Sequence, residues 1–238
     1  MSCTTWTPLA VKSEARDWSA SVWRMVEAQH IASTMKIVDD AAEQDVLEWL
    51  LEGSKPPMPA AAQNLDYLLA SPFRYDPKRG GSRFRGEADP GVFYGAESVR
   101  TAAAELGYWR WKFLRDAVDL QQLEPVAHTA FCADIQTLAV DLRQAPFAVD
   151  VALWTHRQDY RPTQAFARQA REAEVGAIVY VSVRDPEPGW CAAVLRPDAF
   201  ANPKPQPGMQ TWWLAVHQDQ VVWRREGQSW IFPSDNWH

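Results

Sequence analysis

The chain has 238 residues, of which 47% are hydrophobic and 23% are charged, and its formal net charge is −6 at pH 7. This composition supplies enough apolar side chains for a packed core and excludes wholesale disorder. The negative net charge argues against general binding to nucleic acid or to an anionic membrane, because both need a broad positive surface.

The cysteines and histidines show no pattern of a metal site. Cys3, Cys132 and Cys191 are widely spaced and form no CxxC or Cys/His group, and no HExxH spacing occurs. Isolated cysteines are typical of a reducing compartment. The N-terminal residues lack an apolar stretch of signal-peptide length, and no apolar run reaches about 18 residues. We therefore expect a cytoplasmic protein with no metal and no membrane segment.

Hydrophobic spacing and capping residues predict the elements of the N-terminal half. The pair Asp39-Asp40 precedes a segment with helical apolar spacing, so either aspartate is placed to cap a helix there. Ser98 is placed to cap another helix directly after the apolar segment GVFYG. In chain order we expect an arm over residues 1–21, a strand over 22–26, helices over 39–51 and 60–70, a strand over 91–95 and a helix over 99–114.

The C-terminal half has more strands. Pro162 lies in the first turn of a predicted helix, and segments rich in Ile and Val mark strands on both sides of it. We expect strands over residues 129–135, 137–142, 177–183, 191–195, 210–216 and 220–223, and a helix over 162–174. Short strands and separated helices without regular alternation indicate an α+β fold, not a doubly wound parallel sheet.

One domain over residues 1–238 is the expected organisation. The prolines of residues 55–59 make a stiff connector, but the short helix after them leaves no room for a separate first domain. Residues 201–238 form a Trp-rich C-terminal extension, and the chain has 13 tryptophans in all. We expect most of them to pack in the core, because an indole buries a large area.

A small basic segment lies between residues 74 and 85. It ends in the glycine-rich sequence GGSRFRG (80–86), whose spacing is neither GxGxxG nor that of a P-loop. Arg83 and Arg85 stand between glycines, and their planar guanidinium groups are suited to a compact anion such as a pyrophosphate. A solvated surface loop would have the same composition, so the residues alone leave both interpretations open.

Three further polar residues are candidates for a site. Glu105 has only small and aromatic side chains three and four residues away, so it is either exposed or buried against cations from another segment. Ser182 ends an apolar strand, where both ligand contacts and ordinary strand ends are common. Arg24 lies between two apolar residues of a short strand and points either to water or into a polar site.

Four segments taken together resemble the RES domain, a family named for its Arg, Glu and Ser. They are VWRMVEAQH (22–30), PFRYDPKRGGSRFRG (72–86), PGVFYGAESVRTAAAELGY (90–108) and VYVSVRD (179–185). Each segment is short, but the four occur in the family's order. The resemblance extends over a core of residues 22–200.

This resemblance implies an ADP-ribosyltransferase-like mixed-sheet core with added N-terminal helices. RES-domain proteins typically degrade NAD as toxins of bacterial toxin–antitoxin pairs, with an Xre-like antitoxin as partner. We therefore expect an enzyme with NAD as its substrate, which cleaves the nicotinamide–ribose bond by hydrolysis or phosphorolysis. Two alternatives stay open: transfer of ADP-ribose to a protein target, and a non-catalytic module that binds proteins. The oligomeric state also stays open.

The resemblance also implies roles for particular residues. The residues it makes catalytic are Glu105, Arg24 and Ser182. Those it makes NAD-binding are Arg83, Tyr94 and Arg24. We add Arg85 to the NAD-binding set because it stands between the same glycines as Arg83, and we expect no metal from the cysteine and histidine spacing. The chain departs from the family pattern in two places: Phe84-Arg85 stands where many members have Trp-Asn, and residues 190–193 (WCAA) lack an asparagine that is common there.

Overall fold

The computed structural model describes residues 6–28, 40–75, 81–117, 119–187 and 189–237. One mixed sheet of eight strands extends through this part of the chain. Its strands are β1 (Arg16–Glu27), β2 (Phe93–Ala96), β3 (Gln122–Asp141), β4 (Ala177–Val181), β5 (Trp190–Val194), β6 (Gln210–His217), β7 (Gln220–Arg225) and β8 (Gln228–Pro233). The α-helices are α1 (Pro8–Glu14), α2 (Ala41–Ser54), α3 (Tyr67–Arg74), α4 (Val99–Asp116), α5 (Val151–Trp154) and α6 (Arg161–Glu172). The 3-10 helices are η2 (Ala60–Ala62), η3 (Phe147–Asp150), η4 (Pro197–Ala199) and η5 (Ser234–Trp237).

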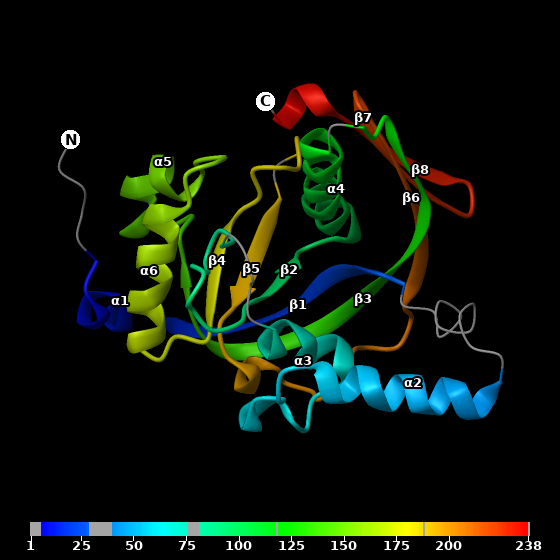
Figure 1. Cartoon of the computed structure of the whole chain (residues 1–238). Coiled ribbons are helices and arrows are strands. Elements are labelled where there is room, and N and C mark those ends of the chain that lie inside the picture. The colour runs from blue at the N-terminus through cyan, green and yellow to red at the C-terminus, as the bar shows by residue number, and fades with distance from the viewer. Residues whose placement is uncertain (1–5, 29–39, 76–80, 118, 188, 238) are drawn as a thin grey trace.

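The strands lie in the order β1-β2-β5-β4-β3-β6-β7-β8. β1 also pairs with β3 along its whole length, from Arg16 opposite Ala139 to Glu27 opposite His128, so the five strands from β1 to β3 close on themselves. β3 and β4 are parallel, and the other paired strands are antiparallel. The long β3 continues past this ring to β6, and β7 and β8 extend the sheet (Figure 1).

The helices cover different parts of the sheet (Figure 1). α1, α5 and α6 lie together beside β4, and α2 and α3 lie below β1 and β3 in this view. α4 packs against β1, β6 and β7. Within the described residues, no helix has the length and apolarity needed to cross a membrane.

Several predictions from local signals are confirmed. The chain has an α+β fold with a mixed sheet and helices in its N-terminal part. The main-chain N–H of Glu43 donates to Asp40 at 2.9 Å at the start of α2, whereas Asp39 lies outside the described residues. The N–H of Thr101 donates to Ser98 at 3.1 Å at the start of α4. α6 begins with proline in its first turn, and β2, β4, β5, β6 and β7 lie within a few residues of their predicted positions.

Several predicted boundaries are wrong. The two strands expected over 129–135 and 137–142 are one strand, β3, and the strand expected over 22–26 is the end of β1. Polar residues in β1 and β3, such as Ser19 opposite Gln136, pair through their main chains, so polarity did not mark a strand end. The expected arm over 1–21 therefore contains α1 and the first part of β1.

Two further elements differ from the expectation. The helix expected over 60–70 is divided into η2 and α3, because Asp66 accepts from the N–H of Leu68 at 2.9 Å and caps a new helix. β8 was not predicted. Its sequence QSWIFP follows Gly227, ends in Pro233 and is short, so it showed little hydrophobic alternation.

The Trp-rich C-terminal extension packs onto α4 and belongs to the core. Trp223 is fully buried and donates to the carbonyl of Ala103 on α4 at 3.1 Å. Trp237 on η5 packs against Tyr108 and Trp111 of the same helix, with ring centroids 5.7 and 5.6 Å away. The extension therefore fixes the outer side of the helix that carries Glu105.

Candidate functional site

A pocket of about 220 Å³ lies where α4 faces β1, β2, β4 and β5. Its polar lining consists of Arg24, Ser82, Arg83, Tyr94, Glu105, Tyr160, Tyr180 and Arg184. Glu105 is the one carboxylate among the described residues that line it. The structure thus brings Arg24, Arg83, Tyr94 and Glu105 to one pocket, although they belong to a strand, a loop, a second strand and a helix.

Glu105 is held by Ser182, which lies just behind the pocket wall. The hydroxyl of Ser182 donates to Oε1 of Glu105 at 2.6 Å, and Ser182 itself is only 5% exposed. Burial raises the pKa of Glu105 above its ordinary value of 4.5. The hydrogen bond from Ser182 and the charges of Arg83 and Arg184 lower this pKa, so they favour the ionised carboxylate, whereas burial favours the protonated form.

The glycine-rich loop of residues 81–86 is fixed from several sides. Ser82 and Arg85 form an isolated antiparallel bridge, and the side chain of Gln164 on α6 donates to both their carbonyl oxygens. A Cβ on Gly81 would lie 2.2 Å from the carbonyl oxygen of Arg85, so only glycine fits there. The loop is therefore a rigid support that directs Arg83 into the pocket.

Tyr94 contributes to this loop as well as to the pocket. Its hydroxyl lies 2.7 Å from Oγ of Ser82 and accepts from the main-chain N–H of Phe84 at 3.0 Å. Burial raises the pKa of Tyr94, so this hydroxyl stays protonated at neutral pH. Tyr94 therefore positions the loop, and the face of its ring is what remains for a ligand.

Arg24 and Arg83 are held by carbonyl oxygens and aromatic rings. Arg24 donates to the carbonyl of Tyr94 at 2.9 Å and lies over the ring of Phe93, while its Nε is buried with no hydrogen-bond partner. Burial lowers the pKa of Arg24 to about 10, so it stays charged at neutral pH. Arg83 donates to the carbonyls of Trp154 and His156, at 2.8 and 3.0 Å.

Arg184 is a pocket residue that the sequence reasoning missed. It is 2% exposed, lines the pocket and lies over the ring of Tyr108, 3.4 Å from the centroid. The segment VYVSVRD gave no periodic signal for it, because β4 ends at Val181 and Arg184 lies in the turn that follows, where strand alternation does not apply. Tyr160 and Trp109, which also line the pocket, carried no such signal.

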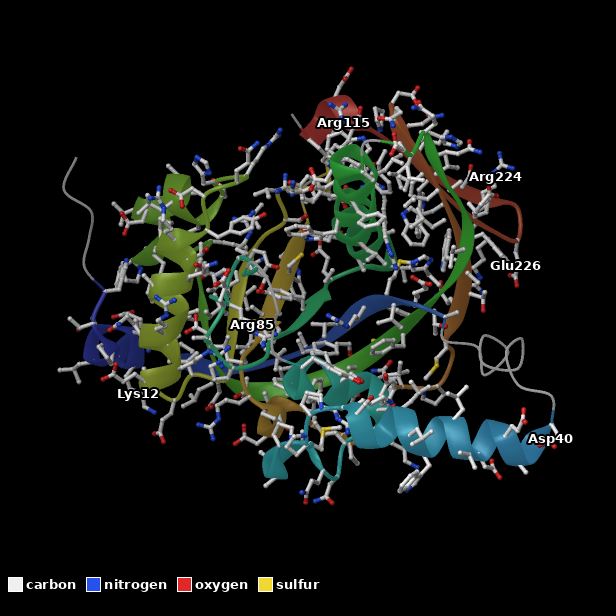
Figure 2. All side chains as sticks on the ribbon, in the orientation of Figure 1. Lys12, Asp40, Arg85, Arg115, Arg224 and Glu226 are labelled. Atoms are coloured by element: carbon white, nitrogen blue, oxygen red, sulfur yellow. The ribbon has the colours of Figure 1, made fainter. Side chains whose placement is uncertain are left out.

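Arg85, which is labelled in Figure 2, does not line this pocket, although it shares the glycine-rich loop with Arg83. Its side chain donates to the carbonyls of Asp89 and Tyr75, at 3.1 and 2.8 Å. It lines a neighbouring cavity of about 620 Å³, which shares Arg24 with the pocket. Arg85 and Glu105 therefore face different cavities.

The comparisons with known proteins place the chain in a family. The sequence profile of the RES domain matches residues 58–217 of the 238. The chain belongs to the RES domain family. A crystal structure of the M. tuberculosis MbcT–MbcA toxin–antitoxin complex contains a similar chain, with 14% identity and a TM-score of 0.49 over 97% of this RES chain and 93% of the other. No curated protein matches.

Part of the pocket of this RES chain lies outside the matched residues. Trp23 and Arg24 on β1 precede them, and both line the pocket. Trp237, which donates to the carbonyl of Arg184, follows them. Among the described residues no group of three or more His, Cys, Asp or Glu side chains is arranged to hold a metal ion.

Proposed function

We propose that this RES chain cleaves the bond between nicotinamide and ribose in NAD. The observation that carries the proposal is that Glu105 lines one pocket together with the guanidinium groups of Arg24, Arg83 and Arg184. Among the residues that the structure describes, none of these three arginines forms an ion pair with a carboxylate. NAD has a complementary charge pattern. Its pyrophosphate carries two negative charges for the arginines, and its nicotinamide ribose is the positive end that a carboxylate attracts.

The chemistry needs only one carboxylate. Nicotinamide is already cationic in NAD, so the C–N bond breaks without a proton and leaves an oxocarbenium ion on the ribose. Glycosidases use two carboxylates because their leaving group is poor and their nucleophile needs a base. In our proposal Glu105, in its ionised form, stabilises the oxocarbenium ion, and Ser182 orients it by the hydrogen bond at 2.6 Å. Water then adds to the cation, which gives ADP-ribose, nicotinamide and one proton.

The arginines and Tyr94 position the substrate in this proposal. Arg24 and Arg83 bind the pyrophosphate, which holds the ribose beside Glu105 and makes the reaction effectively intramolecular. The ring of Tyr94 packs on the ribose or on nicotinamide. The adjoining cavity shares Arg24 and has room for the other end of the dinucleotide, near Arg85. Phosphate in place of water would give phosphorolysis at the same site, and a protein side chain would give ADP-ribosyl transfer.

The biological setting in this proposal follows from membership of the RES family. The chain would be the toxin of a toxin–antitoxin pair in the cytoplasm, with an ADP-ribosyltransferase-like core formed by one domain and an Xre-like antitoxin as partner. Induced expression is then expected to deplete cellular NAD and arrest growth, and coexpression of the antitoxin to restore both. NAD levels that stay constant during growth arrest would point to a different target.

The direct test is NAD turnover by the purified chain and by Glu105→Gln. The substitution preserves the shape of the side chain and removes its charge, so turnover is expected to fall by roughly two powers of ten or more. Glu172→Gln, on the exposed face of α6, is the matched control and keeps full turnover. Mass spectrometry of the products separates water, phosphate and protein as acceptors. Full activity in a folded Glu105→Gln protein would remove Glu105 from the mechanism, and NAD left intact by the wild type would refute the enzyme.

A further inference from the structure

Arg184 is the most deeply buried of the three pocket arginines, and its hydrogen bonding is incomplete. It is 2% exposed, compared with 8% for Arg83. Its Nη2 donates to the carbonyl of Arg157 and to the hydroxyl of Tyr160, the latter at 3.1 Å. Its Nη1 is buried and has no hydrogen-bond partner. An unsatisfied donor on a buried cation is costly, so a partner for Nη1 is expected when the pocket is filled.

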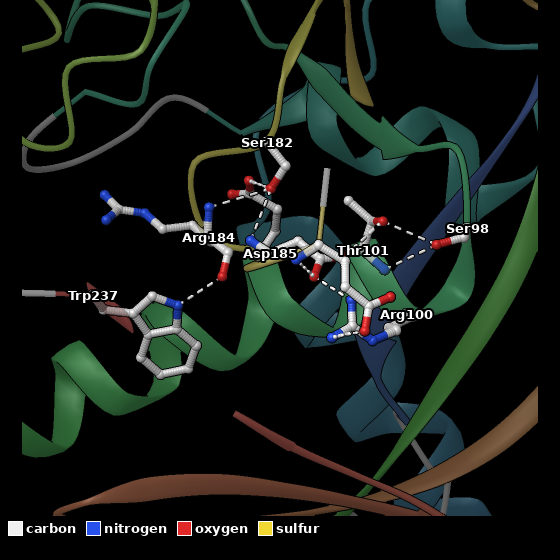
Figure 3. A network of polar contacts seen from close by, with 9 residues as sticks. Ser98, Arg100, Thr101, Ser182, Arg184, Asp185 and Trp237 are labelled. Carbon is white, nitrogen blue, oxygen red and sulfur yellow. Dashed lines mark hydrogen bonds and ion pairs between the residues drawn. The ribbon is translucent and has the colours of Figure 1, made fainter. Parts of the chain in front are cut away.

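The carboxylate next to Arg184 in the chain does not balance its charge. Asp185 is 9% exposed and accepts instead from Arg100 and from the hydroxyl of Thr101, the latter at 3.0 Å (Figure 3). Arg100 also pairs with Glu187 at 3.1 Å. The charge of Arg184 therefore remains available to a ligand.

Tyr160 brings Arg184 close to Arg83. The guanidinium carbon of Arg83 lies 4.8 Å from the centroid of the Tyr160 ring, and Arg184 donates to the hydroxyl of the same residue. Two cations at one tyrosine repel each other in a buried site unless an anion lies between or beside them. A diphosphate supplies two charges, and its oxygens match the fork of a guanidinium group.

We propose that Arg184 and Arg83 form a diphosphate clamp on two sides of Tyr160, in which Nη1 of Arg184 donates to a phosphate oxygen. The dinucleotide that carries this diphosphate is taken from the proposed function. The clamp itself is a binding site for pyrophosphate, so it is tested without any reaction.

The C-terminal extension holds Arg184 in position for this clamp. Trp237 donates from its indole N–H to the carbonyl of Arg184 at 2.8 Å (Figure 3). Trp237 also packs against Tyr108, whose ring lies 3.4 Å from the guanidinium carbon of Arg184. On the other side, the main-chain N–H of Arg184 donates to Oγ of Ser182 at 3.3 Å. One tryptophan therefore fixes both the main chain and the aromatic platform of Arg184.

Calorimetry with inorganic pyrophosphate tests the clamp on the full chain. Arg184→Gln is expected to lower pyrophosphate affinity at least tenfold, and Arg184→Lys to lower it less, since lysine keeps the charge but not the fork. Arg168→Gln, which removes a half-exposed arginine bonded to Asp89, is the control and leaves the affinity unchanged. Unchanged affinity in a folded Arg184→Gln protein overturns the clamp. Loss of pyrophosphate binding in a chain that cleaves no NAD would support the clamp and refute only the proposed function.

Trp237→Phe provides a second test, which also serves if Arg184→Gln does not fold. Phenylalanine keeps a ring against Tyr108 and removes the indole donor, so pyrophosphate affinity is expected to fall severalfold. In NAD turnover the same variant is expected to raise KM with little change in kcat, because the clamp binds the substrate and does not touch the reacting bond. Wild-type affinity and KM in Trp237→Phe would show that the extension does not position Arg184.

Discussion

The arginines of the pocket differ from five ion-paired arginines elsewhere in the chain in what balances their charge. The five arginines of this second group lie outside the pocket and bond to carboxylates: Arg143 to Asp141, Arg161 to Asp159, Arg196 to Asp198, Arg168 to Asp89 and Arg100 to Asp185. Inside the pocket, Arg24, Arg83 and Arg184 bond to carbonyl oxygens and lie over the rings of Phe93, Tyr160 and Tyr108. Carbonyls and rings fix the direction of a guanidinium group without neutralising it.

This difference shows that the pocket keeps buried cations that lower the stability of the folded protein. A buried cation without a counter-charge disfavours the folded state, and burial lowers the pKa of Arg24 to about 10. Glu105 is the one carboxylate among the described residues that line the pocket with these three cations, so full compensation of their charge requires a bound anion. The paired arginines have the opposite character, because their ion pairs are complete in the free protein. Substitutions that break an ion pair should therefore lower the free energy of unfolding, whereas substitutions of a pocket arginine should mainly weaken ligand binding.

Among substitutions at the ion-paired arginines and their partners, Asp185→Asn should have the largest effect on the free energy of unfolding. It leaves Arg100 with Glu187 alone and weakens the bond from Thr101, so the free energy of unfolding is expected to fall. Loss of one partner of a buried pair costs about 3–5 kcal/mol, and we expect roughly 2 kcal/mol here. The reduction reflects Arg100, whose side chain is 23% exposed. Urea unfolding monitored by tryptophan fluorescence measures it.

The control for this prediction is Asp159→Asn, which breaks a pair on the surface. The partner of Asp159 is Arg161, whose side chain is 88% exposed, so the free energy of unfolding is expected to change little compared with Asp185→Asn. Equal losses in the two variants would contradict the distinction between a buried pair and a surface pair.

Arg24→Gln should reduce NAD affinity while leaving the free energy of unfolding nearly unchanged. Removal of a buried charge without a counter-ion offsets the loss of its bond to the carbonyl of Tyr94, so the free energy of unfolding should stay within about 0.5 kcal/mol of the wild type. NAD affinity, measured by calorimetry, should fall by roughly tenfold, the effect of one hydrogen bond to a charged group. A strongly destabilised protein that still binds NAD normally would make Arg24 a structural residue.

The sequence predicted best where the signal is local. The caps at Asp40 and Ser98 marked helix starts because each accepts from a main-chain N–H three residues away. The partners of Glu105 were beyond such reasoning, since Ser182 is 77 residues away and meets it only when β4 lies beside α4. The resemblance to RES domains, not residue spacing, named both members of this pair.

The directions of the side chains in the glycine-rich loop were also beyond local sequence reasoning, although the residues concerned are neighbours in the chain. Arg83 and Arg85 stand in the same glycine-rich chain, so composition did not choose between them, and only the resemblance to RES domains pointed to Arg83. Their directions are set by the bridge between Ser82 and Arg85 and by the bonds from Gln164, which lies about 80 residues further along the chain. Side-chain direction in an irregular loop depends on such distant contacts.

Ser182→Ala should produce the smallest of these effects and the one most specific to the mechanism. The hydroxyl of Ser182 lowers the pKa of Glu105, which burial raises above 4.5, so its removal raises that pKa further. If ionised Glu105 stabilises the oxocarbenium ion, activity rises with pH as Glu105 loses its proton. The acidic limb of the profile of kcat/KM against pH is then expected to move to higher pH. At neutral pH the loss should be about fivefold, the effect of one hydrogen bond worth about 1 kcal/mol.

The pH profile separates this role of Ser182 from a general loss of structure. A variant that is merely misfolded loses activity at all pH values, whereas Ser182→Ala should approach wild-type activity on the alkaline side, where Glu105 is ionised without help. Ser13→Ala, which removes a hydroxyl on the surface of α1 that bonds to the carbonyl of Ala10, should keep the wild-type profile. A uniform loss with an unmoved acidic limb would mean that Ser182 supports the turn to Arg184 and Asp185, whose N–H groups it also accepts, and does not tune Glu105.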